Sequence, residues 1–338
     1  MFLHKNINIL RCFKILYRDQ VRQRLCSSLN FKETVIERKA EARKMFIFEN
    51  TSSNIDENNH FVNDEVLSNE FNCEIVNCYP WVYRRRNFYL IELKDKKDTI
   101  KLLNNCVFIP GSFPIETRMI KSKIEFPSNT EQNKKKFYVF NSSINNKALN
   151  CSELRKNYTS DSLIELFEQK YSMSNFSLYL RYFLISQLED IICQGVFNDF
   201  EIYPFGSSVV GLGNSFSDLD IALLKRVHAR NSNNQFCQSE VMSQRDQIQQ
   251  SLSLIADISR YFLPNFSQIY RILRARVPIV KMSFDLAPIE IDISIEISEE
   301  SGHHGVIMAN YISYCTKFDP KIRQLFIILK LWAKQHGN

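Results

Sequence analysis

The segment FGSSVVGLGNSFSDLDIALL, residues 205–224, constrains this chain more than any other part of its sequence. Its last six residues are apolar except for Asp220, which predicts a strand at 219–224. Because alternate residues of an extended chain point to the same face, Asp218 and Asp220 stand about 6.5 to 7 Å apart at the backbone. Two carboxylates at that separation repel each other unless a cation lies between them. The segment therefore predicts a site for a divalent cation.

A tight turn precedes this pair of carboxylates. Gly206, Ser207 and Ser208 directly follow a strand predicted at residues 201–205. A glycine lets the backbone approach a ligand closely, and the N–H groups of such a turn attract an anion. We therefore expect a phosphate to be held beside the cation site.

A third carboxylate comes from the stretch PIEIDISIEI, residues 288–297. Its polar side chains alternate with isoleucines, so Asp292 lies on the polar face of a predicted strand. Taken alone, this pattern also describes a half-exposed antiparallel strand of any sheet. Together with segment 205–224, it predicts that Asp292 joins the first two acids.

The order and spacing of GSS, DLD and the later EIDIS resemble the DNA-polymerase-β-like nucleotidyltransferases. The similarity is to the branch of poly(A) polymerases and terminal uridylyltransferases, and most of all to the mitochondrial poly(A) polymerases. It implies an α+β fold: a nucleotidyltransferase palm, which is a mixed β-sheet with flanking helices, followed by the start of a helical central domain. It also implies that AMP from ATP is added without a template to the 3′ end of RNA.

The resemblance assigns roles to the residues of these motifs. Asp218, Asp220 and Asp292 are implied to be the catalytic acids that hold two Mg²⁺ or Mn²⁺ ions in an in-line displacement. Gly206 and Ser207 are implied to seat the β and γ phosphates of the nucleotide, with Ser208 as a helper.

A helix predicted to begin near residue 318 carries two further basic residues. By comparison with the family, Lys330 and Lys334 are expected to bind the phosphates of the nucleotide. An exposed helix face explains both lysines equally well.

Residues 44–120 are predicted to form a small domain in the order βαββαβ, which is the arrangement of RNA-recognition domains. The stretch RRRNFYLIEL fits the RNA-recognition signature at its basic position and its first aromatic, but Leu90 and Leu93 replace stacking aromatics. Two alternatives follow: the sheet binds RNA, or the domain packs on a partner or on itself, as in a homodimer. The residues expected to contact RNA are Arg84, Arg85, Arg86 and Phe88.

The remaining boundaries follow from composition. Seven basic residues face one acid in the first 32 positions. This predicts a mitochondrial transit peptide over residues 1–40 and a location in the matrix, with an RNA-contacting basic arm as the alternative. Residues 121–155 are polar and predict a linker, 156–300 the palm domain, and 301–338 the start of the central domain.

Bulk composition limits function less than the motifs do. A net charge of +6 favours a polyanionic partner only mildly, and nine scattered cysteines predict no zinc site. The most apolar late run, residues 325–333, is short and contains a lysine, so no membrane span is predicted.

The chain ends at Asn338, where relatives continue with most of the central domain and the residues that read the base. We therefore expect an incomplete central domain and leave base choice open. Three functions remain: an adenylyltransferase, a terminal uridylyltransferase, and a shortened, inactive protein that binds RNA or dimerises.

Overall fold

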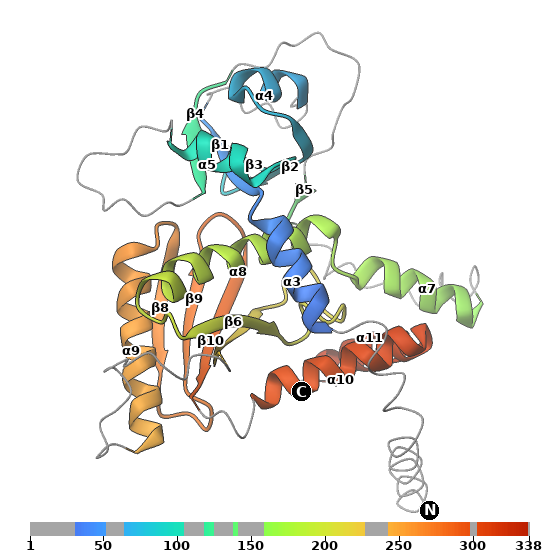
Figure 1. Cartoon of the computed structure of the whole chain (residues 1–338). Helices are drawn as coiled ribbons and strands as arrows, with labels where there is room; N and C mark the ends of the chain where they lie inside the picture. Colours follow the sequence, from blue (N-terminus) through green and yellow to red (C-terminus); the bar gives the residue numbers. More distant parts are fainter. Residues whose placement is uncertain are drawn as a thin grey trace, which may run out of the picture.

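The structure, a computed structural model, describes residues 31–51, 64–104, 118–124, 138–140, 159–226, 243–297 and 303–336. These residues form two five-stranded sheets with helices around them, one sheet above the other in Figure 1. The first 30 residues of the predicted transit peptide lie outside the described part.

The N-terminal sheet has the strand order β4-β1-β3-β2-β5. Its strands and the helices beside it are β1 (Met45–Asn50), α4 (Asp64–Phe71), β2 (Ile75–Tyr83), β3 (Arg86–Leu93), α5 (Lys96–Asn104), β4 (Met119–Ser122) and β5 (Tyr138–Val139). The first six elements confirm the predicted βαββαβ order. The direction of strand β4 differs from this arrangement. A β-α-β crossover leaves its two strands parallel, so β4 should run with β3 and against β1, yet β4 pairs parallel with β1.

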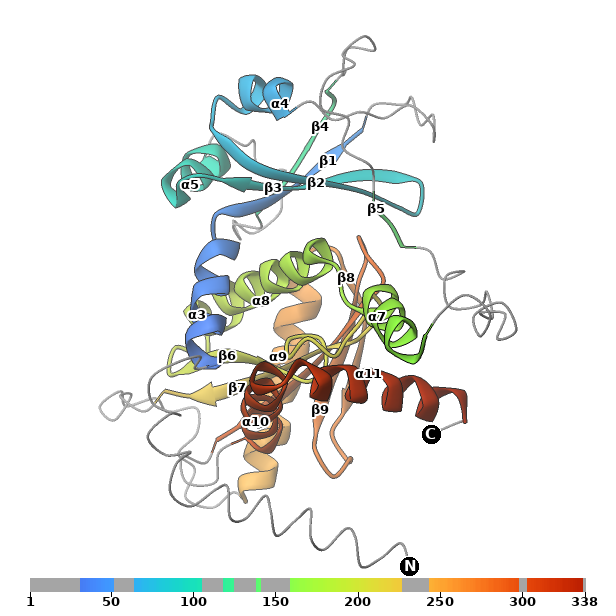
Figure 2. The ribbon, with the colours of Figure 1, turned by 90° about the vertical axis from the view of Figure 1, so that its right-hand side faces the viewer.

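Both faces of the N-terminal sheet are covered. One face packs on α4 and α5 through side chains such as Phe48 and Tyr89. The other face packs on helix α8 (Asn175–Gly195), where the Trp81 ring stacks on Phe88 and contacts Phe176. Figure 2 shows α8 between this sheet and the sheet below it. The surface on which an RNA-recognition domain would stack bases is therefore the contact with the rest of the chain.

This packing changes the interpretation of the predicted RNA residues. Phe88 is completely buried, so no base can stack on it, and its predicted contact with RNA is wrong. Arg86 donates two hydrogen bonds to the Glu49 carboxylate, at 2.8 and 2.6 Å, which neutralise its charge. Arg84 and Arg85 are exposed in the β2–β3 turn, both with positive φ, and their contact with RNA stays a prediction.

Trp81 provides a test of the contact between the two sheets. Its indole Nε1 donates a 2.8 Å hydrogen bond to the carbonyl of Leu286, and the side chain is fully buried. We expect Trp81→Phe to lower the free energy of unfolding by about 1 to 3 kcal/mol, because it leaves that carbonyl without a donor. Chemical unfolding measures the loss. Val76→Ala, at an exposed position of the same strand, is the control and should change stability by less than about 0.5 kcal/mol. Equal stabilities of the two variants would contradict the proposed contact.

The C-terminal sheet has the strand order β6-β7-β10-β9-β8. Its elements are β6 (Phe200–Phe205), β7 (Leu219–Lys225), α9 (Gln244–Phe262), β8 (Phe266–Ile272), β9 (Ile279–Phe284) and β10 (Ile289–Glu296). The strands predicted at 201–205 and 219–224 are confirmed to within a residue. Helix α9 packs on β8, β9 and β10, and α8 packs on β6 and α9, which buries a large apolar core.

Helix α3 (Phe31–Ala42) belongs to this folded body. Phe31 and Val35 are buried in the main core, and α3 packs along α8. The Lys39 ammonium group donates to the Glu189 carboxylate at 2.5 Å and to the carbonyl of Ile202 at 2.9 Å. Residues 31–40 of the predicted leader therefore lie in this packed helix, and the position at which a leader would be removed stays a prediction.

Three further helices, one ahead of the C-terminal sheet in sequence and two after it, lie at one end of that sheet. They are α7 (Ser160–Tyr171), α10 (His304–Phe318) and α11 (Pro320–Gln335). Helix α11 lies beside α7 (Figures 1 and 2). The sequence predicted the last helix near its true start but missed α10 before it. The predicted linker at 121–155 is partly wrong as well, because it contributes the end of β4 and all of β5 to the N-terminal sheet.

None of the described helices is both long enough and apolar enough to cross a bilayer.

Candidate active site

The three predicted aspartates lie side by side on two neighbouring strands. β10 pairs parallel with β7, and this register places Asp292 directly beside Asp220. Paired residues of adjacent strands share a face of the sheet, so both carboxylates stand on one side, with Asp218 two residues before Asp220. The predicted convergence is therefore confirmed, although Asp292 follows Asp220 by 72 positions along the chain.

Burial and repulsion act on these acids together. Loss of solvent, followed by the charges of Asp292 and Asp218, raises the pKa of Asp220 to about 6. Burial also raises the pKa of Asp218 against the opposing charge of Lys281. In the described part of the chain, Asp292 Oδ1 is a buried oxygen without a hydrogen-bond partner. A bound cation would lower the pKa values of Asp218 and Asp220 and would give Asp292 Oδ1 a ligand to contact. Carboxylate oxygens suit Mg²⁺.

Lys281 was not anticipated from the sequence. It lies on β9 opposite Asp292, and its ammonium nitrogen is 2.7 Å from Glu290 Oε2, 3.4 Å from Asp292 Oδ1 and 3.8 Å from Asp218 Oδ2. It is thus a cation built into the acid cluster. Across the described segments, no three His, Cys, Asp or Glu side chains are gathered closely enough to hold a metal ion. A metal would require the acids to close further around it.

The turn at Gly206 fits closely against these acids. Gly206 has a φ of +77°, in the left-handed region that favours glycine. A Cβ at this position would overlap the Asp220 carboxylate and lie 2.9 Å from its Cγ. The missing side chain therefore lets the turn and the acid approach each other.

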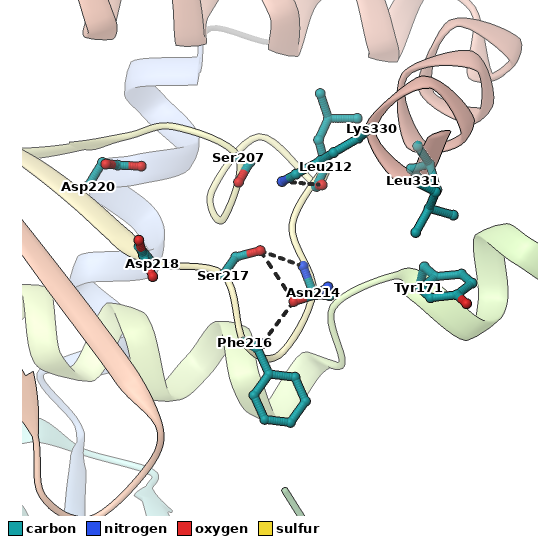
Figure 3. A pocket seen from close by; sticks show the side chains of 11 residues that line it. Tyr171, Ser207, Leu212, Asn214, Phe216, Ser217, Asp218, Asp220, Lys330 and Leu331 are labelled. Atoms are coloured by element: carbon teal, nitrogen blue, oxygen red, sulfur yellow. Dashed lines mark hydrogen bonds between the residues drawn. The ribbon is translucent and has the colours of Figure 1, made fainter. Parts of the chain in front are cut away.

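A cavity of about 330 Å³ opens beside Asp218 and Asp220 (Figure 3). The residues that line it are Tyr171, Ser207, Leu212, Asn214, Phe216, Ser217, Asp218, Asp220, Ile327, Lys330 and Leu331. Ser207 and Lys330 were predicted to bind the nucleotide, and both line this cavity. The Lys330 ammonium group donates to the carbonyl of Leu212 at 3.4 Å, which draws α11 towards the β6–β7 turn.

Of the two other predicted nucleotide contacts, Ser208 and Lys334, the structure describes only the side chain of Ser208. Ser208 is buried and does not line the cavity, because the backbone of Gly213 closes over it: a Cβ on Gly213 would lie 2.9 Å from the Cα of Ser208. Its predicted role as a helper at the phosphates is therefore wrong. Lys334 lies on α11, but its side chain is outside the described part of the structure.

Two arginines that the sequence analysis did not single out hold the walls of the cavity. Arg323 of α11 donates to the carbonyl of Gly211 at 3.0 Å and to the Glu168 carboxylate at 2.7 Å. Arg181 of α8 is fully buried and donates to the carbonyls of Ser215 and Ser217, directly before Asp218. Burial lowers the pKa of Arg181 to about 10. No local pattern marks either residue, because each partner is distant along the chain.

Comparison with known proteins places this site in a family. Residues 160–299 match the family described as "Poly(A) RNA polymerase, mitochondrial-like, central palm domain". This part of the chain has the fold of a nucleotidyltransferase palm and is similar to the palm domains of poly(A) RNA polymerases.

Individual relatives agree with the palm assignment. The chain is 29% identical over 175 residues to the mitochondrial poly(A) RNA polymerase of Drosophila melanogaster, covering 49% of this chain and 28% of that protein. The enzyme of the same name from Mus musculus is 25% identical over 257 residues, covering 72% of this chain and 43% of that protein. The matched region thus spans less than half of each relative.

The fold of the palm and of the N-terminal sheet also recurs in a solved structure. The crystal structure of mtPAP in complex with GTP superposes with a TM-score of 0.73 at 22% identity, covering 90% of this chain and 63% of that one. At this level of identity the likeness concerns the fold.

Arg181 provides a test of how the palm positions its acids. We expect Arg181→Met to lower the free energy of unfolding by about 3 kcal/mol, because one buried and two partly buried carbonyls lose a charged donor. Thermal and urea unfolding measure the loss. Arg245→Met is the matched control, since Arg245 also donates to two carbonyls but is exposed, and it should lose less than about 1 kcal/mol. Similar losses in the two variants would contradict this role of Arg181.

Proposed function

We propose that this chain adds AMP from ATP to the 3′ end of RNA without a template, as a polyadenylating enzyme of the mitochondrial matrix. The observation that carries the proposal is the row of Asp218, Asp220 and Asp292 at the rim of a cavity that Ser207 and Lys330 also line. The names of the relatives support adenylation, and mtPAP has been solved with ATPγS, CTP, GTP and UTP.

The acids of the row would hold the metal ions of the reaction. The all-carboxylate donor set fits Mg²⁺ or Mn²⁺, and Asp292 Oδ1 accepts no hydrogen bond, although the Lys281 ammonium group lies 3.4 Å from it. When bound, such ions stabilise charge on the attacking and leaving oxygens of an in-line displacement. Asp292 Oδ1 is also placed to accept the proton of the RNA 3′-hydroxyl as that oxygen attacks the α phosphorus. Lys281 balances the negative charge of the cluster from the β9 side.

The turn and α11 would hold the triphosphate. The hydroxyl and backbone of Ser207 donate to the β and γ phosphates, and Gly206 lets these groups come close to Asp220. The Lys330 ammonium group reaches the same cavity and neutralises charge on the leaving pyrophosphate, with Lys334 one turn further along α11. The products are an RNA longer by one nucleotide and pyrophosphate.

The remaining parts of the proposal concern location, assembly and domain bounds. The basic residues of positions 1–30 and the names of the relatives support the mitochondrial matrix. The edges of the N-terminal sheet, β4 and β5, could pair with a second copy in a homodimer. We place this domain at 44–139, so that it includes β4 and β5, the palm at 156–300 and the start of the central domain at 301–338.

A primer-extension assay tests this function. The full chain is incubated with a 5′-labelled RNA oligonucleotide, MgCl₂ and each nucleoside triphosphate singly, and the products are separated on a denaturing gel. We expect extension with ATP that disappears when EDTA removes the metal. Extension with UTP in preference to ATP would support the uridylyltransferase instead. RNA binding without extension by any nucleotide would support the inactive RNA-binding protein.

A further inference from the structure

The C-terminal sheet continues beyond the acids on the side away from the cavity. Among the described residues that line the cavity, none comes from β8, β9 or β10. The strand register places Asp292 beside Asp220, Lys281 beside Asp292, and Tyr270 beside Lys281. A row of side chains therefore leads from the acids across the sheet to its edge strand, β8.

Tyr270 ends this row on the open face of the sheet. Directly paired residues of neighbouring strands share a face, so Tyr270 lies on the same face as Lys281. The adjacent Arg271 points to the opposite face, where its guanidinium group pairs with Asp257 of α9. Tyr270 is 58% exposed, and the described segments show no other ring against it. Its aromatic face is thus available beside the acid cluster.

The chemistry of the proposed function decides what arrives on this face. An in-line displacement places the attacking and leaving oxygens on opposite sides of the transferred phosphorus. With the triphosphate in the cavity, pyrophosphate leaves towards Ser207 and Lys330. The RNA 3′-hydroxyl must then approach Asp292 from the side of β9 and β8. This step rests on the proposed function.

We propose that Tyr270 is the stacking platform for the 3′-terminal base of a single-stranded RNA. An exposed aromatic ring stacks on the face of any base, which suits an enzyme that must hold each newly added nucleotide in turn. Arg274 and Arg276 follow Tyr270 in the β8–β9 connection, and both are exposed. No carboxylate partner for either guanidinium group is found in the described part of the chain, so both can contact phosphates further along the RNA.

RNA binding without nucleotide tests this site separately from catalysis. The affinity of the full chain for a 5′-fluorescein oligoadenylate is measured by fluorescence anisotropy, with a second RNA whose 3′-terminal base has been removed. We expect Tyr270→Ala to weaken binding of the intact RNA about 5- to 30-fold, and Tyr270→Phe to bind it like the native chain. Tyr261→Ala is the matched control, because Tyr261 is 73% exposed on α9, which packs on the opposite face of the sheet.

The RNA without a terminal base makes the test specific. If Tyr270 stacks on that base, the native chain and Tyr270→Ala bind this RNA equally. A loss of affinity that persists with this RNA, an unchanged affinity of Tyr270→Ala for intact RNA, or no measurable RNA binding would each overturn the proposal. A chain that extends RNA independently of Tyr270 keeps the proposed function but not this site. Tyr270-dependent binding of RNA without any extension would keep this site but not the proposed function.

Discussion

Asp292→Asn should abolish nucleotide addition, lowering kcat by at least about 10³-fold. The substitution keeps the size of the side chain but removes the charge that would hold a metal ion beside Asp220. It also replaces an oxygen that can accept the 3′-hydroxyl proton. Single-turnover primer extension with saturating ATP and RNA measures the loss. Thermal melting should be nearly unchanged, because the side chain is only partly buried and the substitution removes no packing.

Glu290→Gln is the matched control for this experiment. Glu290 lies on the same strand and the same face as Asp292, and it also pairs with Lys281, but it is exposed and does not adjoin Asp220. We expect it to slow addition by less than about 10-fold. If both variants lost activity equally, the effect would come from Lys281 losing a partner. If Asp292→Asn stayed within 10-fold of the native rate, the catalytic assignment of Asp292 would be wrong.

Gly206→Ala is expected to reduce nucleotide addition by about 10²-fold or more, because the new methyl group occupies the place of the Asp220 carboxylate. The acid or the turn must move, and a displacement of about 1 Å at a catalytic group is enough for a loss of this size. The positive φ adds strain, so the free energy of unfolding should also fall, by about 1 to 3 kcal/mol.

Gly195→Ala separates this effect from a general cost of changing glycine. Gly195 ends α8, and a Cβ built there meets no atom within 4 Å. This variant should be fully active and as stable as the native chain, or slightly more so. Rates and unfolding curves of the two variants are compared at equal protein concentration. Native activity in Gly206→Ala would show that the turn does not need to approach Asp220.

The face of the sheet that carries the three aspartates was predictable because its signal is local. Alternation in DLD and in EIDIS assigns each aspartate to a polar face of its strand, and Gly206 marks a turn that excludes a side chain. The prediction that Asp292 joins the first two acids came from the combination of the EIDIS strand with segment 205–224. The parallel register of β10 and β7 then set Asp292 beside Asp220.

No such local pattern predicted which residues would contact the three aspartates. Lys281 is a half-buried residue of the strand IVKMSF, where its alternation with Val280 and Met282 could have shown that it shares a face with other polar groups. What it contacts depends on the pairing of β9 with β10. The family resemblance assigned Ser208 to the phosphates, yet the fold of the turn buries it under Gly213.

By itself, the sequence determined the βαββαβ order of the N-terminal domain, the face on which each acid stands and the chemistry that three carboxylates favour. Only the tertiary structure decided which surfaces remain open. Trp81 and Phe88 have the same aromatic character whether they bind RNA or pack on α8, and their burial against Phe176 excludes the first use. The physical reason is that periodicity records which face of an element is apolar, whereas the partner of that face is set by contacts between residues far apart in the chain.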